Sequence, residues 1–165
     1  MPWTGNRGII KRILNPTPTI QSNPQITKVL SIIPEGGKIV DLGAGGRKIT
    51  PECVTIDFTR IGDTNVVADI HNIPLKDETI DCLFCTGTLE HVHNPETVLK
   101  EILRVLKKEG IIYIDVPFMQ CYHPDPVDYW RFTIKGIELI CTRNGFTMIE
   151  TGVNIGSASS LTWIL

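Results

Sequence analysis

The chain has 165 residues, of which 42% are hydrophobic and 21% are charged, which is the size and composition of one globular domain. Its net charge of −2 and pI near 6.1 argue against a nucleic-acid partner, because nucleic-acid-binding domains usually carry a basic surplus. No leader of charged and then apolar residues opens the chain, and no apolar stretch is long enough to span a bilayer. We therefore expect a cytoplasmic protein without a membrane span.

The first 24 residues are rich in Pro, Asn, Thr and Gly and predict an N-terminal arm, helical only at 9–14, before a domain at 25–165. Residues 24–33 carry apolar side chains at helical spacing, with Asn23 as the cap and Pro24 in the first turn. Four nearly continuous apolar runs follow, as is typical of strands buried on both faces of a parallel sheet: 38–42, 53–58, 65–69 and 80–86.

The second half of the chain begins with the clearest predicted helix, at 94–110, which has Asn94 as its cap, Pro95 in its first turn and lysines in its last turn. A strand at 111–118, a polar and aromatic segment at 119–133, a helix at 134–144 and a strand at 146–153 complete the pattern. Strands that alternate with helices and loops predict an α/β fold with a doubly wound sheet.

Cysteine and histidine spacing predicts neither a disulfide framework nor a metal site. Cys82 and Cys85 lie three apart in an apolar run, so a strand would point them to opposite faces, and we expect reduced core cysteines. The histidines share no ligand spacing on one element, so we expect no metal: His71, His91, His93 and His123.

The glycine-rich stretch KIVDLGAGGRKIT (38–50) follows the first predicted strand, where the ligand crevice of such a sheet lies. Glycines let the backbone approach a ligand closely, although a plain tight turn would use them too. Asp57 ends the second predicted strand, where its carboxylate can accept both hydroxyls of a ribose, and Asp69 ends the third, where it can face an adenine amine. Together the loop and the two acids predict an adenosine pocket.

NAD is the obvious rival ligand. Its fingerprint G-x-G-x-x-G requires glycine or alanine at the position of Lys48. The short crossover that follows contains Pro51 and leaves little helix to bind a pyrophosphate. The loop therefore fits a dinucleotide poorly.

Four stretches resemble the class I S-adenosylmethionine-dependent methyltransferases of the small-molecule type (Methyltransferase type 11-like): IVDLGAGG (39–46), TIDF (55–58), ADIHNIPLKDETIDCLFCTGTLEHV (68–92) and LKEILRVLKKEGIIYIDVPF (99–118). The resemblance covers roughly residues 25–153 and implies a Rossmann-like, mostly parallel sheet with S-adenosylmethionine as the cofactor. It also implies the cofactor contacts, which are Asp41, Gly43, Ala44, Gly45, Asp57, Phe58, Asp69, Ile70, Cys85 and Thr86.

The chain departs from the family pattern in two places. Arg47 occupies the position of the family's third glycine, and we expect Arg47 and Lys48 to point to solvent. The family's last, antiparallel strand has no evident segment before Leu165, so either the chain is truncated or the sheet is one strand short.

The acceptor side is predicted in the segment 119–133. His123 is the candidate general base, His91 of the LEHV turn is a second candidate, and an acceptor pocket is expected from Tyr129, Trp130 and Arg131. The alternative is an ordered loop in which Arg131 pairs with an internal aspartate and Trp130 packs down. The stretch HPDPVDYWRFT (123–133) also resembles a bacterial methyltransferase subgroup, some of whose members are associated with surface-glycan metabolism.

Two hypotheses of different class follow. The first is a methyltransferase acting on a small-molecule or glycan-precursor acceptor. The second is a catalytically inactive binding module that pairs with a partner protein, or with its own copy, through an uncovered C-terminal sheet edge. A nicotinamide-dependent oxidoreductase is a distant third.

Overall fold

The computed structural model describes residues 23–153. The predicted arm up to residue 22, with its helix at 9–14, and residues 154–165 lie outside the described residues. No helix within the described range is long and apolar enough to cross a membrane.

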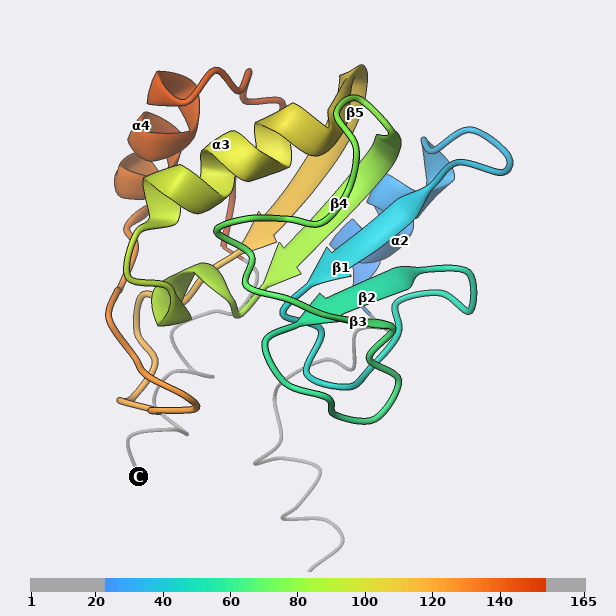
Figure 1. Ribbon diagram of the computed structural model, residues 1–165. Coiled ribbons are helices and arrows are strands. Elements are labelled where there is room, and N and C mark those ends of the chain that lie inside the picture. The colour runs from blue at the N-terminus through green and yellow to red at the C-terminus, as the bar shows by residue number, and fades with distance from the viewer. Residues whose placement is uncertain (1–22, 154–165) are drawn as a thin grey trace, which may run out of the picture.

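Five parallel strands form one sheet in the order β3-β2-β1-β4-β5, which confirms the predicted α/β fold (Figure 1). The strands are β1 (Ile39–Leu42), β2 (Val54–Asp57), β3 (Val66–Val67), β4 (Ile80–Thr86) and β5 (Leu106–Asp115). The chain builds outward from β1 through β2 to β3, then returns to place β4 on the other side of β1. The strand order therefore reverses between β1 and β4, and a crevice forms at their carboxyl ends.

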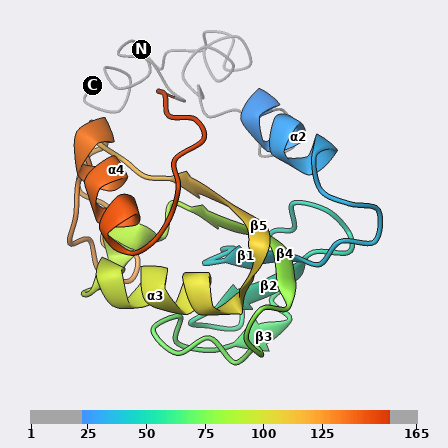
Figure 2. The ribbon, with the colours of Figure 1, turned by 90° about the horizontal axis from the view of Figure 1, so that it is seen from above.

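Helices cover both faces of the sheet, as Figure 2 shows with α3 and α2 on opposite sides. They are α2 (Pro24–Ser31), α3 (Pro95–Val105) and α4 (Ile134–Arg143), and a short 3-10 helix, η2 (Leu89–His91), follows β4. Successive side chains of β4 alternate between the faces: Leu83 and Cys85 join the core cluster that includes α3, whereas Cys82 and Phe84 join the cluster that includes α2. Both cysteines are buried, as expected, and both are free.

The predicted helix starts are confirmed by their caps. The Asn23 side chain accepts a hydrogen bond from the backbone N–H of Gln25 at 2.9 Å, and Asn94 accepts one from Thr97 at 3.1 Å. The end of the helix predicted at 94–110 is wrong, because α3 stops at Val105. Residues 106–110 instead open β5, whose Leu106 pairs with Ile80.

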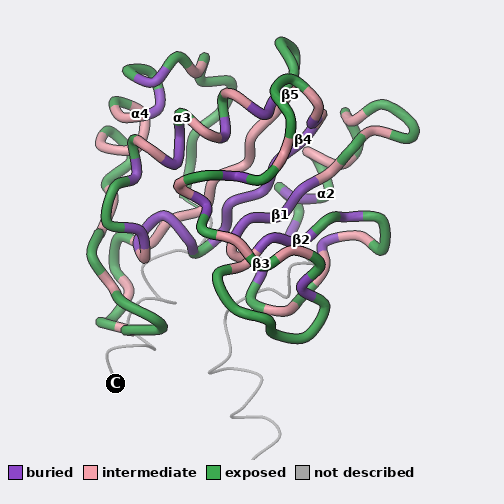
Figure 3. Tube along the Cα trace, in the orientation of Figure 1, coloured by how far each residue is buried: buried purple, intermediate pink, exposed green. Residues whose placement is uncertain are grey.

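The strand predicted at 146–153 is also wrong, because those residues form neither strand nor helix. Within the described part of the chain β5 pairs with β4 alone, and its residues 110–115 remain half-buried. Figure 3 shows the same contrast between the mostly buried β1 and β4 and the half-buried β5. An apolar run is not enough to make a strand when no neighbouring strand pairs with it.

Candidate functional site

The glycine loop after β1 adopts the left-handed backbone that its composition predicts. Gly43, Gly45 and Gly46 have φ values of +67°, +59° and +75°. A Cβ at Gly43 would lie 2.3 Å from Oγ1 of Thr88, so the turn after β4 packs directly on the loop. A Cβ at Gly45 would have no atom within 4 Å, so the loop is open to the crevice there.

Asp57 fixes the loop from the end of β2. One carboxylate oxygen accepts the N–H of Gly45 at 2.9 Å, and the other accepts the N–H of Thr59 at 3.2 Å. Each carboxylate oxygen can accept a further hydrogen bond. Because Asp57 also lines the crevice, its carboxylate is placed to accept the hydroxyls of a ribose.

Asp41 lies beneath the loop rather than on the crevice wall. Its side chain is fully buried, and neither carboxylate oxygen has a hydrogen-bond partner within residues 23–153. Burial raises the pKa of Asp41 from 3.8 to about 7, an effect that the nearby Arg47 charge opposes. A buried carboxylate without a partner beside an open glycine loop fits a cationic ligand group, such as the ammonium of S-adenosylmethionine. Ala44 is buried as well, so its side chain does not line the crevice.

Arg47 does not point to solvent as expected. Its Nη2 donates a hydrogen bond of 2.9 Å to Oγ1 of Thr86, so the exposed side chain crosses from the glycine loop to the end of β4. Lys48 instead reaches back to the carbonyl of Pro51 at 3.4 Å. The expectation of solvent is therefore wrong for Arg47, because the end of β4 offers its guanidinium an acceptor.

The residues expected beside adenine lie on the β2–β3 side of the crevice. Asp69 accepts hydrogen bonds from the backbone N–H of His71 at 2.9 Å and from its ring Nδ1 at 2.6 Å, and these lower the pKa of Asp69. Phe58 is 67% exposed, whereas Ile70 is buried. Both acids and Phe58 line the same crevice, as the predicted adenosine pocket requires.

The Cys85 side chain does not line the crevice, although the sequence placed it there. Its side chain is fully buried in the core cluster that includes α3, where burial raises the pKa of the thiol. Neighbouring strand positions point to opposite faces, and β4 ends at Thr86, which does line the crevice and receives Arg47. Thr86 therefore keeps its predicted place, whereas the Cys85 side chain supports the core.

The acceptor-side segment 119–133 is fastened over the turn after β4. The carbonyl of Glu90 accepts the backbone N–H groups of Tyr129 at 2.8 Å and Trp130 at 3.2 Å. The indole Nε1 of Trp130 donates to the carbonyl of Val92 at 2.8 Å. Two segments that are distant in sequence thus form one wall of the crevice, on the side where the sequence predicts the acceptor.

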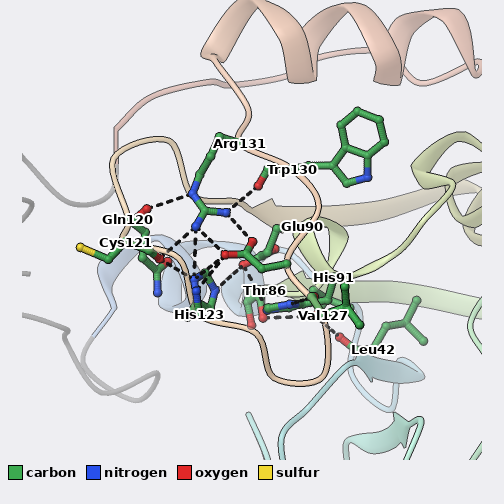
Figure 4. A network of polar contacts seen from close by, with 12 residues as sticks. Leu42, Thr86, Glu90, His91, Gln120, Cys121, His123, Val127, Trp130 and Arg131 are labelled. Carbon is green, nitrogen blue, oxygen red and sulfur yellow. Dashed lines mark hydrogen bonds and ion pairs between the residues drawn. The ribbon is translucent and has the colours of Figure 1, made fainter.

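A cluster of Glu90, His91 and His123 lies where these two segments meet (Figure 4). Oε1 of Glu90 is 3.8 Å from Nε2 of each histidine, and the two imidazole rings meet edge to face with centroids 4.9 Å apart. The Glu90 side chain is 1% exposed, burial raises its pKa, and its Oε2 has no hydrogen-bond partner among the described residues. Both predicted catalytic histidines also line the crevice.

Residues 40–114 match the model of a methyltransferase domain, and they contain the glycine loop, Asp57, Asp69 and the LEHV turn. This stretch of the chain is therefore similar to a methyltransferase domain. The chain spans less than half the length of the curated relatives that it matches. It is 28% identical over 137 residues to the sterol 4-C-methyltransferase strm-1 of Caenorhabditis elegans, and this match covers 75% of this chain and 40% of strm-1. It is 27% identical to the tRNA U34 carboxymethyltransferase of Campylobacter lari, over 51% of this chain and 32% of that protein.

Solved structures share the fold of this chain. An S-adenosylmethionine-dependent methyltransferase from Thermotoga maritima has a TM-score of 0.61 at 23% identity and covers 75% of this chain and 70% of its own. The [4+2]-cyclase SpnF has a TM-score of 0.63 at 17% identity, and the match covers 79% of this chain and 60% of SpnF. A cyclase among the neighbours illustrates that the fold alone does not determine the reaction.

The Arg131 side chain is paired within its own loop. Its guanidinium donates one hydrogen bond to each carboxylate oxygen of Asp128, at 2.5 and 2.7 Å. It also donates to three backbone carbonyls, those of Gln120, Cys121 and Trp130. This bidentate pair lowers the pKa of Asp128. The internal ion pair that the ordered-loop alternative expected is therefore present, and a role of Arg131 in binding substrate stays a prediction.

Of the other two residues predicted for the acceptor pocket, Tyr129 lines the crevice and Trp130 does not. Tyr129 is 53% exposed, whereas Trp130 has its N–H fixed by Val92. Glu90 was not among the predicted site residues. A glutamate next to a candidate catalytic histidine in LEHV was the available signal for Glu90.

Proposed function

We propose that this chain is a methyltransferase that transfers the methyl group of S-adenosylmethionine to a small-molecule or glycan-precursor acceptor. The observation that carries the proposal is the open glycine loop between β1 and β4, where the strand order reverses. Two acids line the same crevice: Asp57 at the end of β2 and Asp69 shortly after β3. S-adenosylmethionine would supply a methyl group on a sulfonium. An acceptor atom would attack the methyl carbon in line, and S-adenosylhomocysteine would leave as the carbon–sulfur bond breaks.

In this proposal each part of the crevice binds one part of the cofactor. The backbone of Gly43–Gly45 and the buried Asp41 carboxylate hold the methionine end, and Asp57 accepts the ribose hydroxyls. Asp69, Ile70 and Phe58 surround the adenine. Arg47 is a further candidate, because its guanidinium crosses the crevice floor to Thr86 and carries the charge that a cofactor carboxylate needs.

A small acceptor is supported by charge and by the crevice wall. The chain has a net charge of −2, without the basic surplus that an RNA acceptor usually requires. Relatives named for sterol, tRNA and rRNA acceptors span that choice, so the acceptor class is our inference. The exposed Tyr129 and the two histidines of the wall face the hollow that the acceptor would enter. His123 or His91 would then accept the proton of an acceptor hydroxyl.

The direct test is a thermal-shift and calorimetry panel on the full chain with S-adenosylmethionine, S-adenosylhomocysteine and NAD. The first two should bind and raise the midpoint of unfolding, because they are ligands of the folded state, while NAD should do neither. A folded protein that binds NAD and neither sulfur compound would overturn the cofactor assignment.

A second candidate function, a binding module that pairs with a partner protein, is supported by β5. Along residues 23–153 this strand has one neighbour, and the crevice continues across it as a hollow of about 2870 Å³, far larger than a ligand pocket. The fold neighbours include a complex of the Haloferax volcanii Trm112 methyltransferase activator. A monomer by light scattering that turns over S-adenosylmethionine by itself would argue against this candidate.

A further inference from the structure

The cluster of Glu90, His91 and His123 brings three potential metal-binding atoms to one point. One ring nitrogen of each histidine and a Glu90 carboxylate oxygen all lie within 4.8 Å of one another. Neither imidazole forms a hydrogen bond with Glu90, because both Nε2–Oε1 distances are 3.8 Å. Three polar atoms thus surround a gap instead of bonding to one another.

The hydrogen bonds on the far side of each ring determine which nitrogen carries the proton. Nδ1 of His91 lies 2.6 Å from the carbonyl of Val127, and Nδ1 of His123 lies 2.9 Å from the carbonyl of Cys121. A carbonyl can only accept, so Nδ1 must donate in both rings. In the neutral tautomer each Nε2 then presents a lone pair toward Glu90. Metal-binding histidines are commonly oriented by this kind of outer hydrogen bond.

We propose that Glu90, His91 and His123 form a binding site for a divalent first-row transition metal, such as Zn²⁺. Two imidazoles and one carboxylate suit these metals, whereas Mg²⁺ and Ca²⁺ prefer sites made of oxygen. With bonds of about 2.1 Å, tetrahedral ligands lie about 3.4 Å apart, so each histidine needs to approach Glu90 by less than about 0.5 Å.

The surrounding charges are compatible with a cation. Glu90 is the buried carboxylate of the cluster, and its second oxygen has no hydrogen-bond partner among residues 23–153. Arg131 is the nearby positive group, with Nη2 3.4 Å from Nδ1 of His123, but both oxygens of Asp128 pair with its guanidinium. The Glu90 charge therefore remains available to balance a metal ion.

Three protein ligands leave at least one coordination position open, as in catalytic zinc sites. His91 and His123 line the crevice, so the open position would face the side where the acceptor is expected. A metal bound there would occupy both Nε2 atoms, and neither histidine would then serve as a free base.

The test uses the full chain, stripped with a chelator and titrated with ZnCl₂ by calorimetry and with CoCl₂ by visible absorption. We expect one metal ion per chain, with Co²⁺ bands of a four- or five-coordinate site. The variants Glu90→Gln, His91→Ala and His123→Ala should each weaken binding by more than about 10-fold, since each removes a ligand.

His93→Ala is the matched control, because His93 stacks on His71 with ring centroids 4.2 Å apart and is not one of the three clustered residues. Its metal affinity should equal that of the unaltered chain. Circular dichroism of each variant separates loss of a ligand from loss of the fold, and His123→Ala changes only a half-buried loop residue. No binding of Zn²⁺ or Co²⁺ by the folded chain, or equal loss in the His93 variant, would overturn the proposal. The readout is metal binding alone, so the result does not depend on methyl transfer.

Discussion

Replacing Asp41 with asparagine should change how the stability of the protein depends on pH. The carboxylate is fully buried and has no hydrogen-bond partner in the described range, so its charged form loses its hydration without compensation. Burial is the main cause of the rise in its pKa from 3.8 to about 7. Asparagine has nearly the same shape but cannot ionise.

The sign of the effect follows from proton binding. Between about pH 4 and pH 7 the folded chain keeps the Asp41 proton while the unfolded chain releases it, so stability falls as pH rises through this range. The difference between the two pKa values corresponds to about 4 kcal/mol at 1.36 kcal/mol for each pH unit, as an upper bound. Of this, about 2 to 3 kcal/mol is lost between pH 5 and pH 8.

Urea unfolding of the full chain at pH 5 and pH 8 measures the effect. Asp41→Asn should lose about 2 to 3 kcal/mol less stability than the unaltered chain between these pH values. Asp125→Asn, at an exposed loop position, is the matched control and should follow the unaltered chain. Parallel profiles for the Asp41 variant and the unaltered chain would refute the argument, since another group would then carry the pH dependence.

Four further substitutions test the crevice and its loops. Asp57→Ala should weaken binding of S-adenosylhomocysteine by about 1–3 kcal/mol in calorimetry, and unchanged affinity would mean that another acid holds the ribose. Arg47→Ala should also weaken that binding, by about 1–2 kcal/mol, with Lys48→Ala as the control; equal effects would place Arg47 outside the site. Gly43→Ala should destabilise the fold more than Gly45→Ala in urea, because only its Cβ meets Thr88; equal losses would leave backbone strain alone as the cause. Arg131→Lys should lower the unfolding midpoint by about 3–6 °C, because lysine cannot donate two parallel hydrogen bonds to Asp128. An unchanged midpoint with lost activity would instead indicate that Arg131 binds substrate.

The order of the elements could be predicted because local signals agree with the fold. Buried strands read as continuous apolar runs, and Asn-Pro pairs start both α2 and α3 where predicted. The end of α3 was missed because residues 106–110 carry a helix-like lysine pattern, whereas pairing of Leu106 with Ile80 draws them into β5. Pairing between distant strands is not visible in the spacing of a single segment.

Side-chain direction limited the prediction of the site in the same way. Asp57 and Thr86, predicted from strand ends, line the crevice, but Cys85, one residue before Thr86 on β4, points to the opposite face and into the core. Arg131 illustrates a second limit, because its internal partner Asp128 was visible in the sequence but its bidentate geometry was not. A charged residue near a crevice is a ligand candidate only after its internal hydrogen bonds are known.

Two buried carboxylates, Asp41 and Glu90, lie near the crevice on different elements. Asp41 lies in β1 beneath the glycine loop, Glu90 lies in η2 after β4, and each has an oxygen without a hydrogen-bond partner in the part of the chain that the structure describes. Leaving such groups unpaired costs about 1–3 kcal/mol each, and more when they are charged, which a fold without ligands has no reason to retain. In our two proposals a cation would remove that cost, with the ammonium end of the cofactor at Asp41 and a metal ion at Glu90. Binding at either position should therefore stabilise the fold, and the two gains should be measurable separately because the carboxylates belong to different elements.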